Sequence, residues 1–261
     1  MRRRKKSLHT MSIYRRFAEA YAKAGRGRFS LELVPWVTAV FERFGAAPTS
    51  LVDVACGAGE FALAMARSGI AVTGVDQSPE MLALARQSAA ASGVPITLLE
   101  QDMRELVVPA SVDAATCLYD SLNYLVDEAE FRRTLAAVAV ALRPNGLFLF
   151  DMITLRGLAE RWGNRTWIIQ DTDDAFEADQ SHFDYDTGIA TLRVNAFLHR
   201  REGLYERIEE VHRERGYPVP VIDAALAATG FERLGCWSSP TFDAVTPDTA
   251  RVFYAVRRGR A

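Results

Sequence analysis

Cysteine, histidine and long apolar runs are all scarce in this sequence, and each scarcity excludes a class of protein. The three cysteines, Cys56, Cys117 and Cys236, lie within or beside apolar, strand-like segments, so we expect small buried side chains rather than a disulfide set. The four histidines have no metal-ligand spacing, and no metal site is expected. No apolar run approaches the ~18 residues that a membrane-spanning helix needs. A reducing cytoplasm is the expected location.

A strong net charge is also lacking, because Lys and Arg number 31 against 33 Asp and Glu. No general basic field is therefore available to attract nucleic acid. The basic residues Arg2 to Lys6 gather at the N-terminus and leave the rest of the chain acidic. We interpret residues 1–10 as a solvated, disordered tail, the alternative being an arm for nucleic acid or a membrane surface. No apolar segment follows the tail, so it does not have the pattern of a secretory signal.

Residues 51–61, with the sequence LVDVACGAGEF, are the stretch on which the prediction of a ligand site depends. The run 51–55 is broken only by Asp53 and is typical of a strand buried on both faces of a parallel sheet. The small residues 56–59 permit a tight turn before a helix-forming segment, where backbone N–H groups can face a ligand. The third glycine of the dinucleotide fingerprint is absent, because Ala62 stands in its place.

Strand-like and helix-like segments alternate through the first half of the chain, which predicts a parallel sheet with helices on both faces. Turn-punctuated, alternating segments then follow and indicate antiparallel hairpins. The predicted strands are 51–55, 70–75, 96–100, 113–118 and 147–150, followed by hairpin strands 181–185, 190–198 and 204–211 and closing strands 233–238 and 251–256.

We expect one α/β domain over residues 1–261. After the tail, residues 11–45 are predicted to form a helical cap of two helices, with a hinge at Gly25 and Gly27. The remaining parts are a cofactor-binding core at 46–155, a β-hairpin insertion forming a lid at 156–216, and a helix and strands of the core at 217–261.

Polar side chains follow the predicted strands at the edge where ligands bind in open parallel sheets. Asp76 ends the second strand, 17 residues after Gly59, near the spacing of a carboxylate that accepts both hydroxyls of a ribose. Asp102 follows the third strand and could accept from an exocyclic amine, with Met103 packing on a purine face.

This set resembles the class I S-adenosylmethionine-dependent methyltransferases. The matching segments are VDVACGAGEFALAMA, VTGVDQSPEMLALAR, LLEQDM, DAATCLYDSLNYL and LRPNGLFLFDM, in order over residues 50–151. The resemblance implies a Rossmann-like, seven-stranded, mostly parallel sheet whose last strand is antiparallel. It also implies S-adenosylmethionine as cofactor and S-adenosylhomocysteine as product. By matching position, the cofactor-binding residues would be Ala55, Gly57 and Gly59 at the methionine part, Asp76 at the ribose, Gln77 and Met81 around the adenosine, Asp102 and Met103 at the adenine, and Leu118 at the methionine amine.

The tyrosine-containing leader, DSLNYL and the hairpin insertion are similar to a small-molecule subgroup that includes N-methyltransferases of glycine-type substrates and amino sugars. In that subgroup the N-terminal helices and the hairpins form a lid. The resemblance implies that Tyr21 and Arg28 contact the cofactor. The candidate catalytic residues are Tyr14, Asp120 and Asn123, which would orient the acceptor together with Tyr124, and His212 as the candidate base.

Methyl transfer to a small-molecule acceptor is the expected function. A neutral amine needs no strong base, whereas a hydroxyl does, so the lack of a clear base favours nitrogen. An RNA- or protein-modifying methyltransferase, a non-catalytic S-adenosylmethionine-binding protein and a nicotinamide oxidoreductase are the alternatives. The pattern that adenine-N6 enzymes use after the fourth strand, Asp/Asn-Pro-Pro-Tyr, is missing. Neither nucleic acid nor a membrane is an expected partner. The acidic insertion suits either an acceptor lid for a cationic substrate or a homodimer interface.

Overall fold

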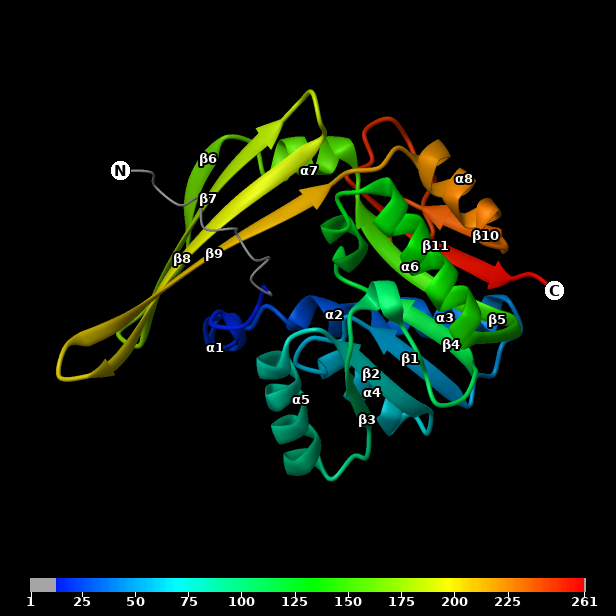
Figure 1. Cartoon of the computed structure of the whole chain (residues 1–261), viewed down its shortest axis with the longest axis horizontal. Coiled ribbons are helices and arrows are strands. Elements are labelled where there is room, and N and C mark those ends of the chain that lie inside the picture. The colour runs from blue at the N-terminus through cyan, green and yellow to red at the C-terminus, as the bar shows by residue number, and fades with distance from the viewer. Residues whose placement is uncertain (1–12, 261) are drawn as a thin grey trace, which may run out of the picture.

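The computed structural model describes residues 13–260 and contains two sheets (Figure 1). A seven-stranded sheet with helices around it forms the body, and a long, twisted four-stranded sheet extends from it as a wing. The predicted disordered tail at residues 1–10 lies outside the described residues.

The seven-stranded sheet has the order β10-β11-β5-β4-β1-β2-β3. All neighbours pair in parallel except β11, which runs antiparallel to both β5 and β10. This confirms the predicted mostly parallel sheet with an antiparallel last strand. Its strands are β1 (Ser50–Val54), β2 (Ala71–Asp76), β3 (Thr97–Glu100), β4 (Val112–Cys117), β5 (Leu142–Ile153), β10 (Phe231–Trp237) and β11 (Arg251–Arg258).

Helices cover both faces of this sheet because its strands present apolar side chains to both sides. In β5, Leu147 and Leu149 face one core and Phe148 and Phe150 face the other, as the two-residue strand period requires. Helices α3 (Val34–Arg43) and α4 (Glu60–Arg67) pack on the first face, and α6 (Glu128–Ala141) and α8 (Val219–Ala228) pack on the second. Helix α5 (Pro79–Ser92) contacts α4, β2 and β3.

The N-terminal segment contains three helices, α1 (Ala18–Lys23), α2 (Arg28–Glu32) and α3, instead of the two predicted. Gly25 has a φ of +63° and turns the chain between α1 and α2, as the predicted hinge requires. The expected second stripe is interrupted because Leu31 on the short α2 is 40% exposed. Gly27 is buried against α4, where an added Cβ would lie 2.2 Å from Glu60 Oε1.

The four-stranded sheet, β6-β7-β8-β9, is an antiparallel meander. Its inner face packs on α1 and on α7 (Leu155–Arg161), over the carboxyl edge of the large sheet. The sequence predicted the last three strands too short and missed the first. The strands are β6 (Arg165–Asp171), β7 (Ala175–Asp184), β8 (Ile189–Arg201) and β9 (Leu204–Arg215).

Candidate active site

The turn between β1 and α4 exposes backbone to the carboxyl edge of the sheet. Ala55 and Gly57 both adopt left-handed conformations, with φ of +57° and +55°. Asp76 ends β2 beside the turn, where Oδ2 accepts from Gly57 N at 2.9 Å and Oδ1 accepts from Ser78 N at 2.8 Å. Burial raises the pKa of Asp76, and these backbone donors oppose that rise. One carboxylate therefore fixes the turn and faces the space beside it.

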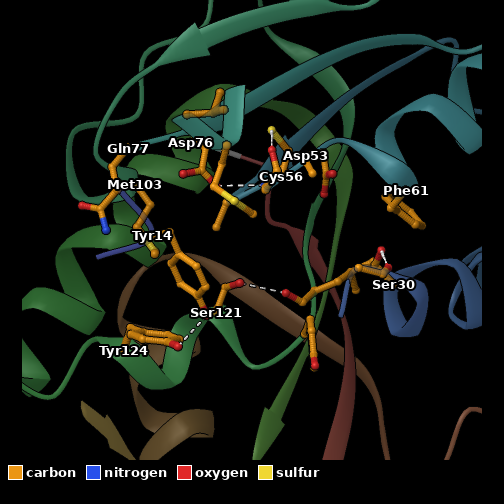
Figure 2. Close-up of a pocket in the computed structure, with 18 of the residues that line it drawn as sticks. Tyr14, Ser30, Asp53, Cys56, Phe61, Asp76, Gln77, Met103, Ser121 and Tyr124 are labelled. Carbon is orange, nitrogen blue, oxygen red and sulfur yellow. Dashed lines mark hydrogen bonds between the residues drawn. The ribbon is translucent and has the colours of Figure 1, made fainter. Parts of the chain in front are cut away.

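A first cavity of about 930 Å³, its open mouth included, lies along this edge. This size is in the range of small-molecule sites. Figure 2 shows Asp76, Gln77 and Met103 on one side of the cavity and Tyr14 and Tyr124 close to them. The predicted site residues that line it are Tyr14, Tyr21, Ala55, Gly57, Asp76, Gln77, Met81, Asp102, Met103 and Leu118.

Two predicted cofactor residues do not line the first cavity. Gly59 begins helix α4 with a φ of +82°, and an added Cβ would lie 3.0 Å from Ala85 Cβ on α5. It serves the packing of two helices instead of the cavity wall. Arg28 is exposed on α2 and lines neither this cavity nor its neighbour. The arginine that turns inward is Arg26, two residues earlier.

Two carboxyl groups of the first cavity have opposite pKa shifts. Asp102 is ion-paired with Arg104 at 2.5 Å, and the hydrogen bonds from that guanidinium lower the pKa of Asp102. Asp53 is buried, and burial raises the pKa of Asp53 to about 7 although Thr116 Oγ1 donates to it at 2.8 Å. In the sequence, Asp53 interrupts an apolar run and was not predicted as a site residue. In the fold it lies beneath the glycine turn and lines the first cavity.

A second cavity, of about 810 Å³ with its mouth, adjoins the first under the four-stranded sheet. The two cavities share a wall of tyrosines, which we call the tyrosine wall: Tyr14, Tyr21, Tyr119 and Tyr124. The other lining groups include the carboxyl groups of Asp120, Asp179 and Glu214, the guanidinium groups of Arg26, Arg161 and Arg165, and the rings of Trp162, Trp167 and His212.

Hydrogen bonds join the tyrosine wall to the four-stranded sheet. Tyr14 and Tyr124 share a hydroxyl–hydroxyl bond of 2.8 Å, and Tyr124 Oη lies 3.1 Å from His212 Nδ1 (Figure 2 shows the tyrosine pair). Burial raises the pKa of both phenols, so they stay neutral donors and acceptors. Burial lowers the pKa of His212 to about 4, and its imidazole is neutral at physiological pH.

Tyr14 belongs to a strap, residues 13–17, that is held at two points. Glu210 on β9 accepts from Tyr14 N at 2.7 Å and from Phe17 N at 3.1 Å. Ser78, the N-cap of α5, donates from its hydroxyl to Tyr14 O at 2.8 Å. The strap thus ties the wing to the carboxyl edge of the large sheet.

Asp120 lies in a loop whose backbone is held in an unfavourable conformation. Tyr119 and Asp120 both have positive φ, +61° and +51°, which is uncommon for residues other than glycine. Asp151 on β5 accepts from both of their N–H groups, at 2.6 and 3.1 Å. Arg251 on β11 pairs with Asp120 at 2.7 Å and also with Asp151. Asp151 and Arg251, which sequence reasoning missed, therefore orient the predicted Asp120.

Asn123 was predicted to orient the acceptor, and the structure contradicts this role. Its Nδ2 donates to Ile153 O and Arg215 O, both at 2.8 Å, and its Oδ1 accepts from Ile153 N at 3.0 Å. The side chain is fully buried and lines neither cavity. Its hydrogen bonds join the end of β5 to the end of β9.

Arg26 is a further residue that the sequence did not single out. It pairs with Asp179 at 3.0 Å and also with Glu177, both on the inner face of β7. These two acids belong to the acidic insertion predicted as an acceptor lid or a homodimer interface, and both are buried. Their spacing of two within a strand was the available signal, because it places both on one face.

Comparisons with known proteins agree with this geometry. Residues 51–146 match the family model described as a methyltransferase domain. A protein of Geobacillus sp. (strain WCH70) described as a "Putative methyltransferase" is 32% identical over 80% of this chain and 84% of its own length. The "Putative methyltransferase YqeM" of Bacillus subtilis (strain 168) is 30% identical over 95% of this chain and 98% of its own.

A solved structure is also similar over nearly the whole chain. The S-adenosylmethionine-dependent methyltransferase from Clostridium acetobutylicum ATCC 824 superposes with a TM-score of 0.81 and 26% identity, covering 94% of this chain and 98% of its own. The chain belongs to the class I methyltransferases: it is an enzyme that uses S-adenosylmethionine.

Within residues 13–260, no helix is long and apolar enough to cross a membrane. Over the same residues, no group of three or more His, Cys, Asp or Glu side chains is placed to hold a metal ion.

Proposed function

We propose that S-adenosylmethionine binds in the first cavity, that a small molecule binds in the second, and that the methyl group passes to an amine nitrogen of that molecule. The tyrosine wall is the observation that carries this proposal, because the two cavities meet there. The second cavity has the size of a small-molecule site, so the acceptor does not have to be a polymer. Binding both reactants on either side of one wall gives the proximity and orientation on which this reaction depends.

The residues of the first cavity fit the cofactor. Each oxygen of Asp76 accepts one backbone N–H, which leaves further lone pairs for two ribose hydroxyls. Gly57 has no side chain, and an added Cβ would lie 3.3 Å from Met81 Cε. The methionine part of the cofactor can therefore approach the backbone at Gly57. We assign the adenine to Asp102 and Met103, the adenosine surroundings to Gln77 and Met81, and the methionine amine to Leu118 and Ala55.

The chain's own residues position the acceptor and exclude water. When bound, S-adenosylmethionine supplies a methyl carbon activated by sulfonium charge, and its carbon–sulfur bond breaks with the electron pair left on sulfur as the bond to nitrogen forms. Tyr14 and Tyr21 line both cavities with neutral phenols at the place where the two cavities meet. Asp120, fixed by Arg251, faces the acceptor from the large sheet, and His212 faces it from the wing.

The preference for nitrogen follows from the weakness of the available base. His212 has a pKa of about 4 and is a poor acceptor for a hydroxyl proton. A neutral amine attacks through its own lone pair, and the product nitrogen takes up the positive charge that sulfur loses, so the transfer itself needs no such base. Three guanidinium groups balance the three carboxyl groups of the second cavity, but the acceptor atoms of Glu214 and Asp179 that receive no N–H or O–H favour a hydrogen-bond-donating molecule.

Matched acceptor pairs test this function. The purified protein is incubated with S-adenosylmethionine and with aliphatic amino alcohols, each beside the alcohol that lacks the nitrogen; S-adenosylhomocysteine and the methylated product are measured by mass spectrometry. We expect product from the amines and none from their alcohol partners. Transfer only to alcohols, or only to added RNA or protein, would contradict the proposal. The alternative interpretation of the hairpin insertion, as a homodimer interface, is tested separately by the mass of the protein in solution.

A further inference from the structure

Glu214 on β9 is a buried carboxyl group that lies beside the carboxyl group of Asp120. Its exposed fraction is 1%, and it lines the second cavity. Among the described residues, no N–H or hydroxyl group donates to Oε1 or Oε2, and the neighbouring polar group is the carboxyl group of Asp120. Native structures rarely leave buried polar atoms unpaired, since desolvation without a partner destabilises the fold.

The other inner-face acids of the wing show what satisfied carboxylates look like here. Glu210 accepts from two backbone N–H groups of the strap. Glu177 is bound by Arg26 and by Gln170 Nε2, the latter at 3.1 Å. Asp179 uses Oδ2 on Arg26, but its Oδ1 is unpartnered and also belongs to the second cavity. Unused acceptor atoms therefore occur where the cavity is and not along the wing in general.

Charged and titratable groups surround Glu214 on several sides. Burial, the charge of Asp120 and a hydrogen bond between the two carboxyl groups raise the pKa of Glu214, and the charges of Arg251 and Arg161 oppose that rise. Glu214 in turn raises the pKa of Tyr14 and of Tyr124. The carboxyl group thus lies within electrostatic reach of the tyrosine wall, where the two cavities meet.

The local fold keeps Glu214 in this place. Strand β9 alternates its faces, so Glu214 shares the inner face with Glu210 and His212. Glu214 pairs across the sheet with Ala190 on β8, which has a small side chain. The next residue, Arg215, is held through its carbonyl oxygen by Asn123 Nδ2. A rigid element with a fixed end is a suitable support for a specificity-determining group.

We propose that Glu214 receives the hydrogen bonds of the acceptor's reacting amine, and that Asp179 Oδ1 receives a second donor on the same molecule. The acceptor class is then a small aliphatic amine that carries at least one further hydroxyl or amino group. This inference rests on the proposed function, because it assigns the acceptor to the second cavity. It goes further in naming the atoms that select the acceptor.

The test compares Glu214→Gln and Glu214→Leu with the parent and with Glu209→Gln. Glu209 is the matched control, since it lies on the exposed face of the same strand and pairs with Arg193 and Arg207. Three quantities are measured: the midpoint of thermal unfolding without acceptor, the Kd for S-adenosylmethionine, and kcat/KM for ethanolamine, 2-amino-1,3-propanediol and glucosamine.

We expect both Glu214 variants to unfold at the same temperature as the parent or higher, because an unpartnered buried carboxyl group is removed. Their Kd for S-adenosylmethionine should stay within ~2-fold, while kcat/KM for the accepted amine falls by ~100-fold or more, as when a polar binding site loses its partner. Glu209→Gln should match the parent in all three quantities. A purely structural role would lower stability together with activity.

Each other outcome also decides the matter. A clear loss of stability in both Glu214 variants, or unchanged kcat/KM, overturns the role of Glu214. If the parent methylates alcohols only, the preference for nitrogen fails. The role of Glu214 is then supported if its variants lower kcat/KM for that alcohol without losing stability, and overturned if they do not. If the parent methylates none of these compounds, the unfolding midpoint alone decides: a midpoint at or above that of the parent supports a ligand role, and a lower one overturns it.

Discussion

Asp76 holds the glycine turn through Oδ2, and its proposed contact with the ribose gives the most direct test at the scale of a residue. We expect Asp76→Ala to weaken S-adenosylmethionine binding by ~10- to 100-fold, about 1.5–3 kcal/mol, because charge-assisted hydrogen bonds are lost. Calorimetry measures the affinity. Asp113→Ala is the control, since Asp113 also accepts from backbone N–H groups, those of Thr49 and Ser50, but far from the first cavity. Equal affinity in a folded Asp76→Ala variant would remove the ribose assignment.

His212 gives a pH-dependent prediction at the same scale. Its pKa falls from an ordinary 6.5 to about 4 on folding, so the unfolded chain binds the proton more readily between these values. His212 therefore contributes stability above pH 6.5 that is lost as the pH falls to 4, roughly 3 kcal/mol in full. Tyr124, Tyr14, Arg26 and Glu210 face the ring; Glu210 Oε2 lies 3.5 Å from Nε2 but is engaged by the strap.

The measurement is urea unfolding at pH 6.5 and at pH 4. We expect His212→Gln to lose less stability than the parent between these two values. Asp53, whose pKa rises to about 7, acts in the opposite direction in both proteins, so the difference between them isolates the histidine. Identical losses would show that this imidazole is already protonated in the folded protein.

At the scale of elements, the strap depends on a single side chain of the wing. Glu210→Ala removes the acceptor for two backbone N–H groups, and we expect residues 13–17 to open more often. Because Tyr14 lines both cavities, this opening should speed the release of S-adenosylhomocysteine and increase hydrogen exchange in the strap. Stopped-flow release and exchange mass spectrometry measure the two effects. Glu209→Ala, on the outer face of β9, should change neither; a similar response in both variants would count against the strap.

The glycine turn gives a second prediction for an element. Gly59→Ala adds a side chain at a φ of +82° and within 3.0 Å of Ala85, whereas Gly45→Ala meets the same backbone cost at +62° with nothing within 4 Å. We expect Gly45→Ala to cost about 1–2 kcal/mol of stability and Gly59→Ala more than that. Urea unfolding of both variants measures the difference. Equal losses would mean that α5 yields easily at Ala85.

At the scale of the molecule, the sequence predicted the large sheet well because its signals are local. The apolar run at 51–55, the glycine turn and the strand-ending Asp76 each depend on neighbours in the chain, and the resulting sheet has the predicted antiparallel last strand. The resemblance that these segments carry also led to the correct family. The positions of most predicted cofactor residues around one cavity follow from the same strand ends.

The second cavity was less predictable because it is made of contacts between distant segments. Glu214 and Asp179 are ordinary charged residues of alternating strands, and both are buried in the fold. Asn123 has the residue type of an acceptor ligand, yet its partners are backbone groups 30 and 92 residues away. Arg28 and Arg26 are two residues apart, and the turn at Gly25 decides which of them faces inward.

The wing leaves the large sheet and returns to it at one point. Asn123 binds backbone on both sides of this junction, at Ile153 and at Arg215, and Gly216 lies so close to Leu155 that an added Cβ would be 2.5 Å from its backbone nitrogen. A segment whose two ends adjoin can be replaced as a unit, that is, as a cassette. Its length and lining can change over evolution without shifting the register of β5 or β11. A lineage could in this way keep one machinery for the methyl donor and exchange the cassette as new acceptors became useful.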